Sequence, residues 1–298
     1  MEQAHALGDV FAETGFAPKP IVPLEDAQIQ SFIENGYLMV RASELSDEFH
    51  QSVTAAAAEL DASGVRGWGS NDVFPIIPQL GELLSESHVH GALTGLLGPG
   101  YALHPHRHCH TSPPGNGDQG IHQDSYEDDS QVRHCRPRWC MAMYYPQDVT
   151  PDLGPTAIVP GSHWYNDPHR DGSQRSGDQI FGKGSGQPGH WCHENEEYKG
   201  VVPPGTVMIV HYEMWHRATK VLSPEATRYS THPPSPHAQT ARPAFRPRDY
   251  LTSSLWSVFK FLVVRMEEPT GPSWNCAADS LPGAQDEWAQ QADAKSLS

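Results

Sequence analysis

The sequence predicts a mainly β domain with α-helices at its N-terminal end. The chain of 298 residues contains 26 Gly and 27 Pro, which is typical of a protein with many turns rather than of a helical bundle. Helical spacing of apolar residues precedes Gly98, and short segments with strand character follow from Tyr101 onward. Barrels and sandwiches with helical additions reach this length as one unit, so we expect a single domain.

Three segments before Gly98 have helical spacing. The first covers residues 24–35 and is followed by Gly36, where a helix end often needs a left-handed residue. The second covers residues 46–60, and its Ser46 can cap the helix. The third covers residues 78–97. We expect strands at residues 37–40, 101–109, 120–125, 139–145, 156–159, 207–212 and 257–265, with long loops at 146–155 and 162–200.

Composition argues against several classes of function. The formal net charge of −16 is unlike that of a protein that binds phosphate backbones, so we expect no nucleic-acid partner. The five Cys form an odd set without a C-x-x-C pair, which favours a reducing compartment over a disulfide framework. Neither a secretion signal nor a membrane span is evident, so we expect a cytoplasmic protein without membrane contact.

The chemistry is expected at His122, Asp124 and His216. His122 and Asp124 stand two residues apart, so on a strand their side chains project from the same face. His216 follows 94 residues later and can complete the set. Two His and one carboxylate on one side of a metal leave its other positions open, as in non-haem Fe(II) oxygenases. With 18 His in the chain this spacing also arises by chance, so the surrounding residues must decide.

A second group of histidines alternates along one predicted strand. On a strand, His104, His106, His108 and His110 lie on one face. One interpretation is a second metal site. The other is a polar cavity whose histidines contact substrate or water, and we favour it because no carboxylate or Cys pair stands nearby.

Several runs of residues around these ligands occur together in a fixed order. They cover residues 119–125, 153–156, 159–163 and 204–207, with Trp215-His216 after the last. With the helix-to-strand passage at 32–37, they strongly resemble the phytanoyl-CoA dioxygenase (PhyH) family of 2-oxoglutarate-dependent oxygenases. The resemblance covers roughly residues 24 to 230, with a return at 257–275.

The resemblance implies a double-stranded β-helix, which is a cupin-like jelly roll with N-terminal helices packed on one sheet. It also implies Fe(II), 2-oxoglutarate as cosubstrate and O2, with release of succinate and CO2. In segment 139–145 large side chains alternate with smaller ones, so one face of this strand can point into the barrel. Met143 is then a candidate wall for the cosubstrate, with core packing as the alternative.

Further site residues follow from the same resemblance. Arg228 stands close to where the family has an Arg that binds the far carboxylate of 2-oxoglutarate, and Ser230 can share that carboxylate. Gln123 resembles a position that contacts the cosubstrate. His163 is expected to be structural, because the equivalent turn of the family holds no ligand. Candidate residues for a small or medium organic substrate are His106, His108, His110, Tyr126, Arg138 and Trp164.

One departure from the family lies after Arg228. Family members continue with a strand directly after this Arg, but residues 231–247 are too rich in Pro for a central strand. The strand-like run at 260–265 is therefore interpreted as that strand, displaced along the chain. We therefore expect one oxygenase domain over residues 1–275 with an insertion at 231–256, and a flexible tail at 276–298. The displacement makes Arg265 an alternative to Arg228.

The leading hypothesis is an Fe(II)/2-oxoglutarate dioxygenase that hydroxylates its substrate. A carboxylate at Asp124 favours hydroxylation over halogenation, because related halogenases have a small residue there; desaturation, epimerisation and ring closure stay open. Two alternatives remain. One is a non-catalytic jelly-roll protein that binds a metal or senses a ligand, and the other is a zinc hydrolase with the same ligands.

Overall fold

Two antiparallel sheets pack face to face at the centre of the molecule. The computed structural model describes residues 5–6, 15–63, 73–99, 101–112, 118–124, 137–164, 197–222 and 256–265. The larger sheet has the strand order β1 (His5–Ala6), β3 (Tyr101–Ser112), β9 (Trp256–Arg265), β4 (Trp139–Tyr145), β7 (Thr206–His211) and β2 (Tyr37–Arg41). The smaller sheet has the order β6 (Tyr198–Lys199), β5 (Thr156–Ile158) and β8 (His216–Ala218).

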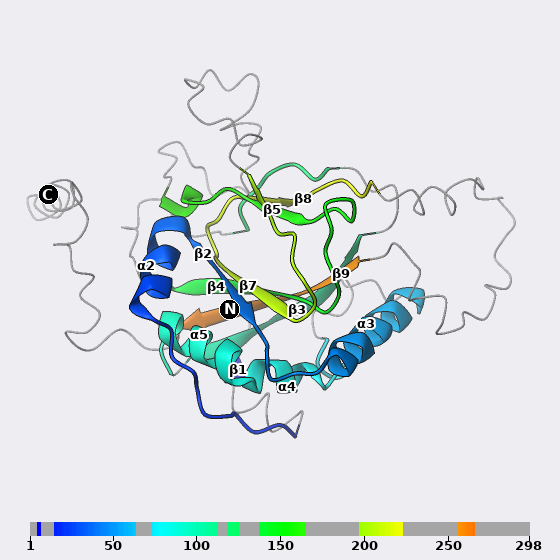
Figure 1. Cartoon of the computed structure of the whole chain (residues 1–298), viewed down its shortest axis with the longest axis horizontal. Coiled ribbons are helices and arrows are strands. Elements are labelled where there is room, and N and C mark those ends of the chain that lie inside the picture. The colour runs from blue at the N-terminus through cyan, green and yellow to red at the C-terminus, as the bar shows by residue number, and fades with distance from the viewer. Residues whose placement is uncertain are drawn as a thin grey trace, which may run out of the picture.

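The helices cover one face of the larger sheet, and β5 and β8 lie on its other side (Figure 1). They are α2 (Asp26–Asn35), α3 (Asp47–Ala62), α4 (Leu80–Ser85) and α5 (Ser87–Leu97). The predicted left-handed end of the first helix is confirmed, because Gly36 has a φ of 76° and its N–H donates to the carbonyl of Phe32. Ser46 caps α3 by accepting a hydrogen bond from the N–H of Phe49.

The alternation along β4 separates two parts of the hydrophobic core. Cys140, Ala142 and Tyr144 pack in the cluster between the larger sheet and the helices. Met141 and Met143 instead join the cluster between the two sheets, which also includes Ile158 of β5. A strand buried on both faces fits only between two packed layers, so the predicted jelly roll with helices on one sheet is confirmed.

Strand β9 lies between β3 and β4, in the middle of the larger sheet. Its register sets Lys260 opposite His108 on one side and opposite Met143 on the other. The predicted strand at 257–265 is therefore present and pairs on both sides. The expected insertion at 231–256 and the tail at 276–298 lie outside the described residues, apart from Trp256, with which β9 begins.

The helical pattern at 78–97 is divided into two helices, α4 and α5, at Glu86. Glu86 has extended backbone angles, and its carboxylate accepts hydrogen bonds from the N–H groups of His88 and Val89. A side chain that caps the second helix competes with continuation of the first, and apolar spacing alone does not reveal this competition.

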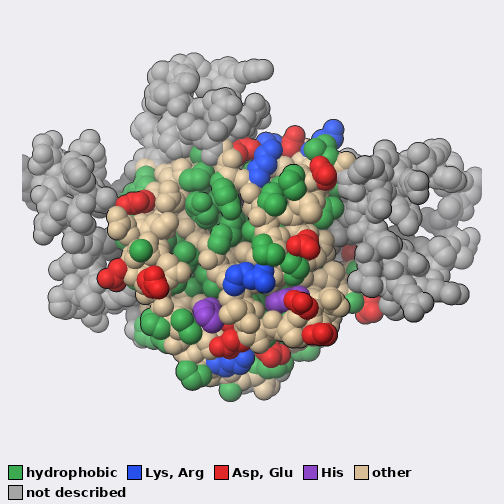
Figure 2. All heavy atoms as spheres, in the orientation of Figure 1, with side chains coloured by type: hydrophobic (Ala, Val, Ile, Leu, Met, Phe, Trp, Pro, Cys, Tyr) green, Lys and Arg blue, Asp and Glu red, His purple; other side chains and the backbone are tan. Residues whose placement is uncertain are grey.

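Charged side chains of both signs are scattered over the described part of the face in Figure 2, among apolar and polar ones. None of the helices in the described part of the chain is long and apolar enough to cross a membrane.

Candidate metal centre

The three predicted ligands come from two backbone segments that pair with each other. His122 and His216 form an antiparallel β-bridge, in which each N–H donates to the carbonyl of the other at 3.0 and 2.9 Å. This pairing brings the two imidazole rings to a centroid separation of 4.5 Å. Asp124 follows His122 by two residues and reaches the same point, as expected for an extended segment.

The donor atoms of these side chains lie close together. Asp124 Oδ1 is 3.5 Å from His122 Nε2, and Asp124 Oδ2 is 3.5 Å from His216 Nε2. All three donor atoms fall within 4.8 Å of one another. The side chains of His122, Asp124 and His216 are 15%, 22% and 6% exposed, so the cluster is shielded but reachable from one side.

Backbone carbonyls fix the tautomer of both histidines. His122 Nδ1 donates to the carbonyl of Gly120 at 2.9 Å, and His216 Nδ1 donates to the carbonyl of Met214 at 3.0 Å. A carbonyl oxygen can only accept, so each Nδ1 carries a proton, and Nε2 is the nitrogen that the neutral ring offers to a metal. A hydrogen bond of this kind also orients a metal-binding imidazole.

The protonation states agree with this assignment. Burial lowers the pKa of His216 below its ordinary value of 6.5, so the imidazole is neutral at pH 7. Burial alone would raise the pKa of Asp124, but charge and hydrogen-bond contacts with its neighbours, among them the Lys260 ammonium, hold it far below its ordinary value of 3.8. A neutral His216 imidazole therefore faces an ionised Asp124 carboxylate.

This donor set fits a divalent metal ion. Two nitrogen lone pairs and a carboxylate are all hydrogen-bond acceptors, and acceptors that face one another need a cation among them. Two imidazoles and one carboxylate suit Fe(II), and their grouping on one side leaves other coordination positions open. Of the two clusters of possible ligands among the described residues, this one has its acceptor atoms turned toward one another.

A lysine that the sequence did not single out for the site also reaches this cluster. Lys260 extends from the middle of β9, and its Nζ donates to Asp124 Oδ2. Its side chain is 15% exposed. The neighbours of Lys260 on β9, Phe259 and Phe261, point to the opposite face and pack among the helices. A charged residue at an inward position of an otherwise apolar strand was the signal in the sequence that could have revealed it.

An ion pair anchors the strand that carries His216. Arg217 binds Glu197 with two hydrogen bonds of 2.7 and 2.9 Å, and its Nη1 lies 3.0 Å from Asp118. The side chain of Glu197 is 2% exposed and that of Arg217 is 14% exposed. Because Asp118 belongs to the segment that leads to His122, Arg217 links the two ligand-bearing segments on the far side from the metal cluster.

Gln123 contributes a second link between the same segments. Its side chain is buried, and its Nε2 donates to the carbonyl of Glu213. This contact ties the residue between His122 and Asp124 to the turn that precedes His216. The predicted contact of Gln123 with the cosubstrate is a separate role and stays a prediction.

Other residues predicted for the site are distributed over several places. Met143 is buried on the inner face, opposite Lys260 and Met208. His110 is half-buried on β3, and the side chains of His106 and His108 lie outside the described residues. Trp164 Nε1 donates to the carbonyl of Ile33 at 2.9 Å, which holds this side chain against the end of α2. Arg138 is exposed just before β4.

Three predicted residues, Tyr126, Arg228 and Ser230, lie outside the described part of the chain, and so does the side chain of Arg265. His163 lies apart from the ligand set: its Nε2 donates to the carbonyl of Ile33 at 3.1 Å, and its ring contacts that of His211 in a tilted arrangement, with 5.0 Å between the centroids. This position agrees with the structural role expected for it.

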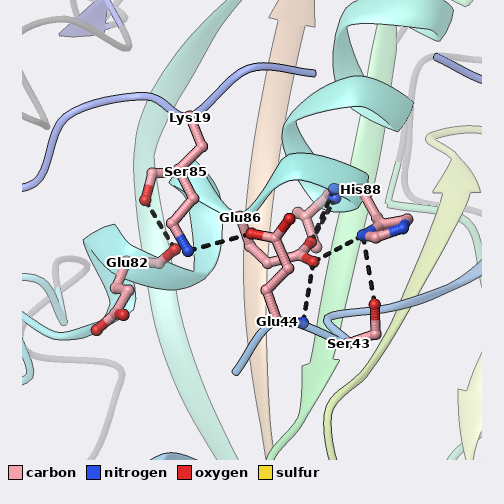
Figure 3. Close-up of polar contacts among 8 residues, drawn as sticks. Lys19, Ser43, Glu44, Glu82, Ser85, Glu86 and His88 are labelled. Atoms are coloured by element: carbon pink, nitrogen blue, oxygen red, sulfur yellow. Dashed lines mark hydrogen bonds and ion pairs between the residues drawn. The ribbon is translucent and has the colours of Figure 1, made fainter. Parts of the chain in front are cut away.

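A second cluster, Glu44, Glu86 and His88, also has three possible ligands (Figure 3). The carboxylate of Glu86 is fully buried and accepts hydrogen bonds from the N–H groups of Glu44, His88 and Val89, and from His88 Nδ1. Glu44 turns its own carboxylate to Lys19 at 3.1 Å. Donors therefore already surround the oxygen atoms of Glu86, and the cluster caps α5.

Comparison with known folds agrees with this geometry. The structure resembles that of SnoK, a non-heme alpha ketoglutarate dependent carbocyclase from nogalamycin biosynthesis, with a TM-score of 0.53, 16% identity and coverage of 90% of this chain and 95% of SnoK. It also resembles EctD from S. alaskensis with 2-oxoglutarate and 5-hydroxyectoine, with a TM-score of 0.55, 14% identity and coverage of 91% and 87%. HygX from Streptomyces hygroscopicus with nickel and 2-oxoglutarate gives a TM-score of 0.52, 15% identity and coverage of 82% and 87%.

No curated protein sequence matches the chain. The family model of phytanoyl-CoA dioxygenase (PhyH) matches residues 83–229, a stretch that includes His122, Asp124 and His216. The family predicted from the sequence motifs is thereby confirmed. The part of the chain that holds all three candidate ligands therefore matches the phytanoyl-CoA dioxygenase family.

Proposed function

We propose that this protein is a non-haem Fe(II)/2-oxoglutarate-dependent oxygenase that hydroxylates a small or medium organic molecule. One observation carries the proposal: two imidazole nitrogens and one carboxylate converge within 4.8 Å, inside the region that matches the phytanoyl-CoA dioxygenase family. In this arrangement His122, Asp124 and His216 would hold the metal.

When bound, Fe(II) and 2-oxoglutarate supply the oxidising chemistry: O2 and a substrate C–H bond yield the alcohol, while 2-oxoglutarate yields succinate and CO2. The residues of the chain orient these partners. The carbonyls of Gly120 and Met214 hold the two imidazoles in the ligating tautomer. Asp124 stays ionised because its pKa is held far below the ordinary value, so it needs no deprotonation before the metal binds.

The cosubstrate is a dianion, and its binding needs positive charge. The metal supplies part of this charge, and the ammonium group of Lys260 lies beside the ligand set. Arg228 and Ser230 remain our candidates for the far carboxylate, because an Arg fork binds a carboxylate through two parallel hydrogen bonds. Met143 and Met208 offer an apolar wall on the inner face that excludes water from the reacting groups.

The substrate is proposed as a small molecule without a nucleic-acid or membrane component, and the chain as cytoplasmic. His110 is the best supported contact of the predicted set, because its side chain is described and it lies on the same face of β3–β9 as Lys260. Hydroxylation is proposed over halogenation because Asp124 supplies a carboxylate ligand. A small residue at this place would instead leave a position on the metal free for chloride. Structures of this fold include a carbocyclase, so ring closure is the second outcome to test.

Succinate formation tests the proposal. Purified protein is supplied with Fe(II), 2-oxoglutarate, O2 and a library of small metabolites, and succinate is measured with and without each component. We expect succinate only when all of Fe(II), 2-oxoglutarate and O2 are present, with a substrate-dependent increase. A metal-loaded protein that forms no succinate with any compound would support the non-catalytic alternative. Turnover without O2 would support a zinc hydrolase.

A further inference from the structure

Lys260 binds the same carboxylate that the metal needs. Its Nζ donates to Asp124 Oδ2, and that oxygen also lies 3.5 Å from His216 Nε2. The lysine therefore meets one of the ligand atoms directly, rather than a group at the edge of the site.

In the metal-free protein, the ammonium group of Lys260 supplies the positive charge that the ligand set otherwise lacks. The Asp124 carboxylate is only 22% exposed, with His122 Nε2 and His216 Nε2 each 3.5 Å from one of its oxygens, so its negative charge needs a cation nearby when no metal is bound. Lys260 supplies one unit of positive charge at this point, on a side chain that is 15% exposed.

A metal ion and this ammonium group exclude each other electrostatically. A divalent ion among the three donor atoms would lie within a few ångströms of Lys260 Nζ, and like charges at such separations in a shielded site repel strongly. The four bonds of the lysine side chain that rotate freely allow the ammonium group to withdraw, whereas the backbone bridge keeps both imidazoles in place.

We propose that Lys260 is a place-holder cation, which neutralises Asp124 in the metal-free protein and is displaced when the metal binds. The inference rests on the proposed function only in taking His122, Asp124 and His216 as the ligand set. Its consequence is that the protein keeps a preformed site in the absence of metal and gives up some metal affinity in return.

The test measures metal affinity without turnover. Binding of Ni(II) to metal-free protein is followed by calorimetry in the wild type and in Lys260→Met, whose side chain suits a position opposite Met143. We expect Lys260→Met to bind Ni(II) about tenfold more tightly, because the competing charge is gone. Lys260→Arg keeps the charge and should show no such gain. Lys199→Met, which removes an exposed lysine from β6, should bind like the wild type.

Unchanged or weaker Ni(II) binding by Lys260→Met overturns the proposal, since a lysine that merely orients Asp124 would strengthen metal binding rather than oppose it.

A wild type that binds no metal contradicts the proposed function instead. A second measurement, made without metal, then still tests the contact between Lys260 and Asp124. In the metal-free protein, Lys260→Met should lower the melting temperature, and the same substitution on an Asp124→Asn background should have a clearly smaller effect. Equal effects on the two backgrounds contradict the pairing.

Discussion

Among the residues that the structure describes, two clusters each bring together three side chains that could bind a metal, yet only one of the two has the right arrangement of donors and acceptors. Four N–H donors surround the carboxylate of Glu86, so its lone pairs are already used. In the other cluster, the proton of each imidazole points away to a carbonyl, and the Nε2 lone pairs face Asp124. Proximity of His and carboxylates is therefore insufficient, and the direction of the protons distinguishes a metal centre from a helix cap.

The two clusters should differ most in how much a substitution in each of them weakens metal binding. Asp124→Ala is expected to weaken Fe(II) or Ni(II) binding by more than about 100-fold, because changes to groups behind the ligands already cost about 10-fold to 100-fold. Glu44→Ala, in the capping cluster, is expected to leave metal affinity unchanged. Calorimetry on both variants measures the difference. Equal losses in the two variants would contradict the distinction between the clusters.

The next effect concerns the ion pair behind His216. Arg217→Met leaves the carboxylate of Glu197 without its charged partner at a position where the side chain is 2% exposed. We expect a loss of about 3 kcal/mol in the free energy of unfolding, together with weaker metal binding as β8 loses its link to Asp118. Urea denaturation gives the first quantity. Lys220→Met, an exposed lysine near the same strand, is the control and should change stability little.

The capping cluster should respond in stability alone. Glu86→Ala removes the acceptor for the N–H groups of His88 and Val89 and is expected to cost about 2 kcal/mol of unfolding free energy. Glu44→Ala breaks an exposed ion pair with Lys19 and a hydrogen bond with Ser87, and should cost less than about 1 kcal/mol. Thermal unfolding of the metal-free variants checks both. A loss of metal affinity in Glu86→Ala would show that the two clusters are coupled.

The smallest effect is the response to acid. The pKa of His216 is lowered in the folded protein by burial, as are those of His50 and His90. The unfolded chain therefore takes up protons first as the pH falls below about 6.5, and the metal-free protein loses stability from there downward. His216→Gln should make this loss smaller. Denaturation at about pH 7.5 and about pH 5.5 compares the two proteins, and an unchanged difference would contradict the neutral state assigned to His216.

Much of this arrangement could be predicted because its signals are local. The spacing of His122 and Asp124 and the alternation along β4 depend only on the two-residue repeat of a strand, and Gly36 follows from the geometry of a helix end. The jelly roll itself came from the resemblance to a family.

The features that were not predicted depend on contacts between distant segments. Lys260 reaches Asp124 only because β9 inserts between β3 and β4, a pairing that no local pattern specifies. Strand β8 is three residues long and is defined by its partners β5 and His122 rather than by its own sequence. The division of 78–97 at Glu86 likewise depends on a side chain that returns to the backbone.

The central claim is that His122, Asp124 and His216 hold Fe(II) with open positions for a keto acid. Anaerobic addition of Fe(II) and 2-oxoglutarate to the metal-free protein tests it most directly, through the visible absorption that arises when a keto acid chelates ferrous iron. We predict this band in the wild type, in stoichiometric amount, and its loss in Asp124→Ala. A wild type without the band, or an Asp124→Ala variant that keeps it, would contradict the account.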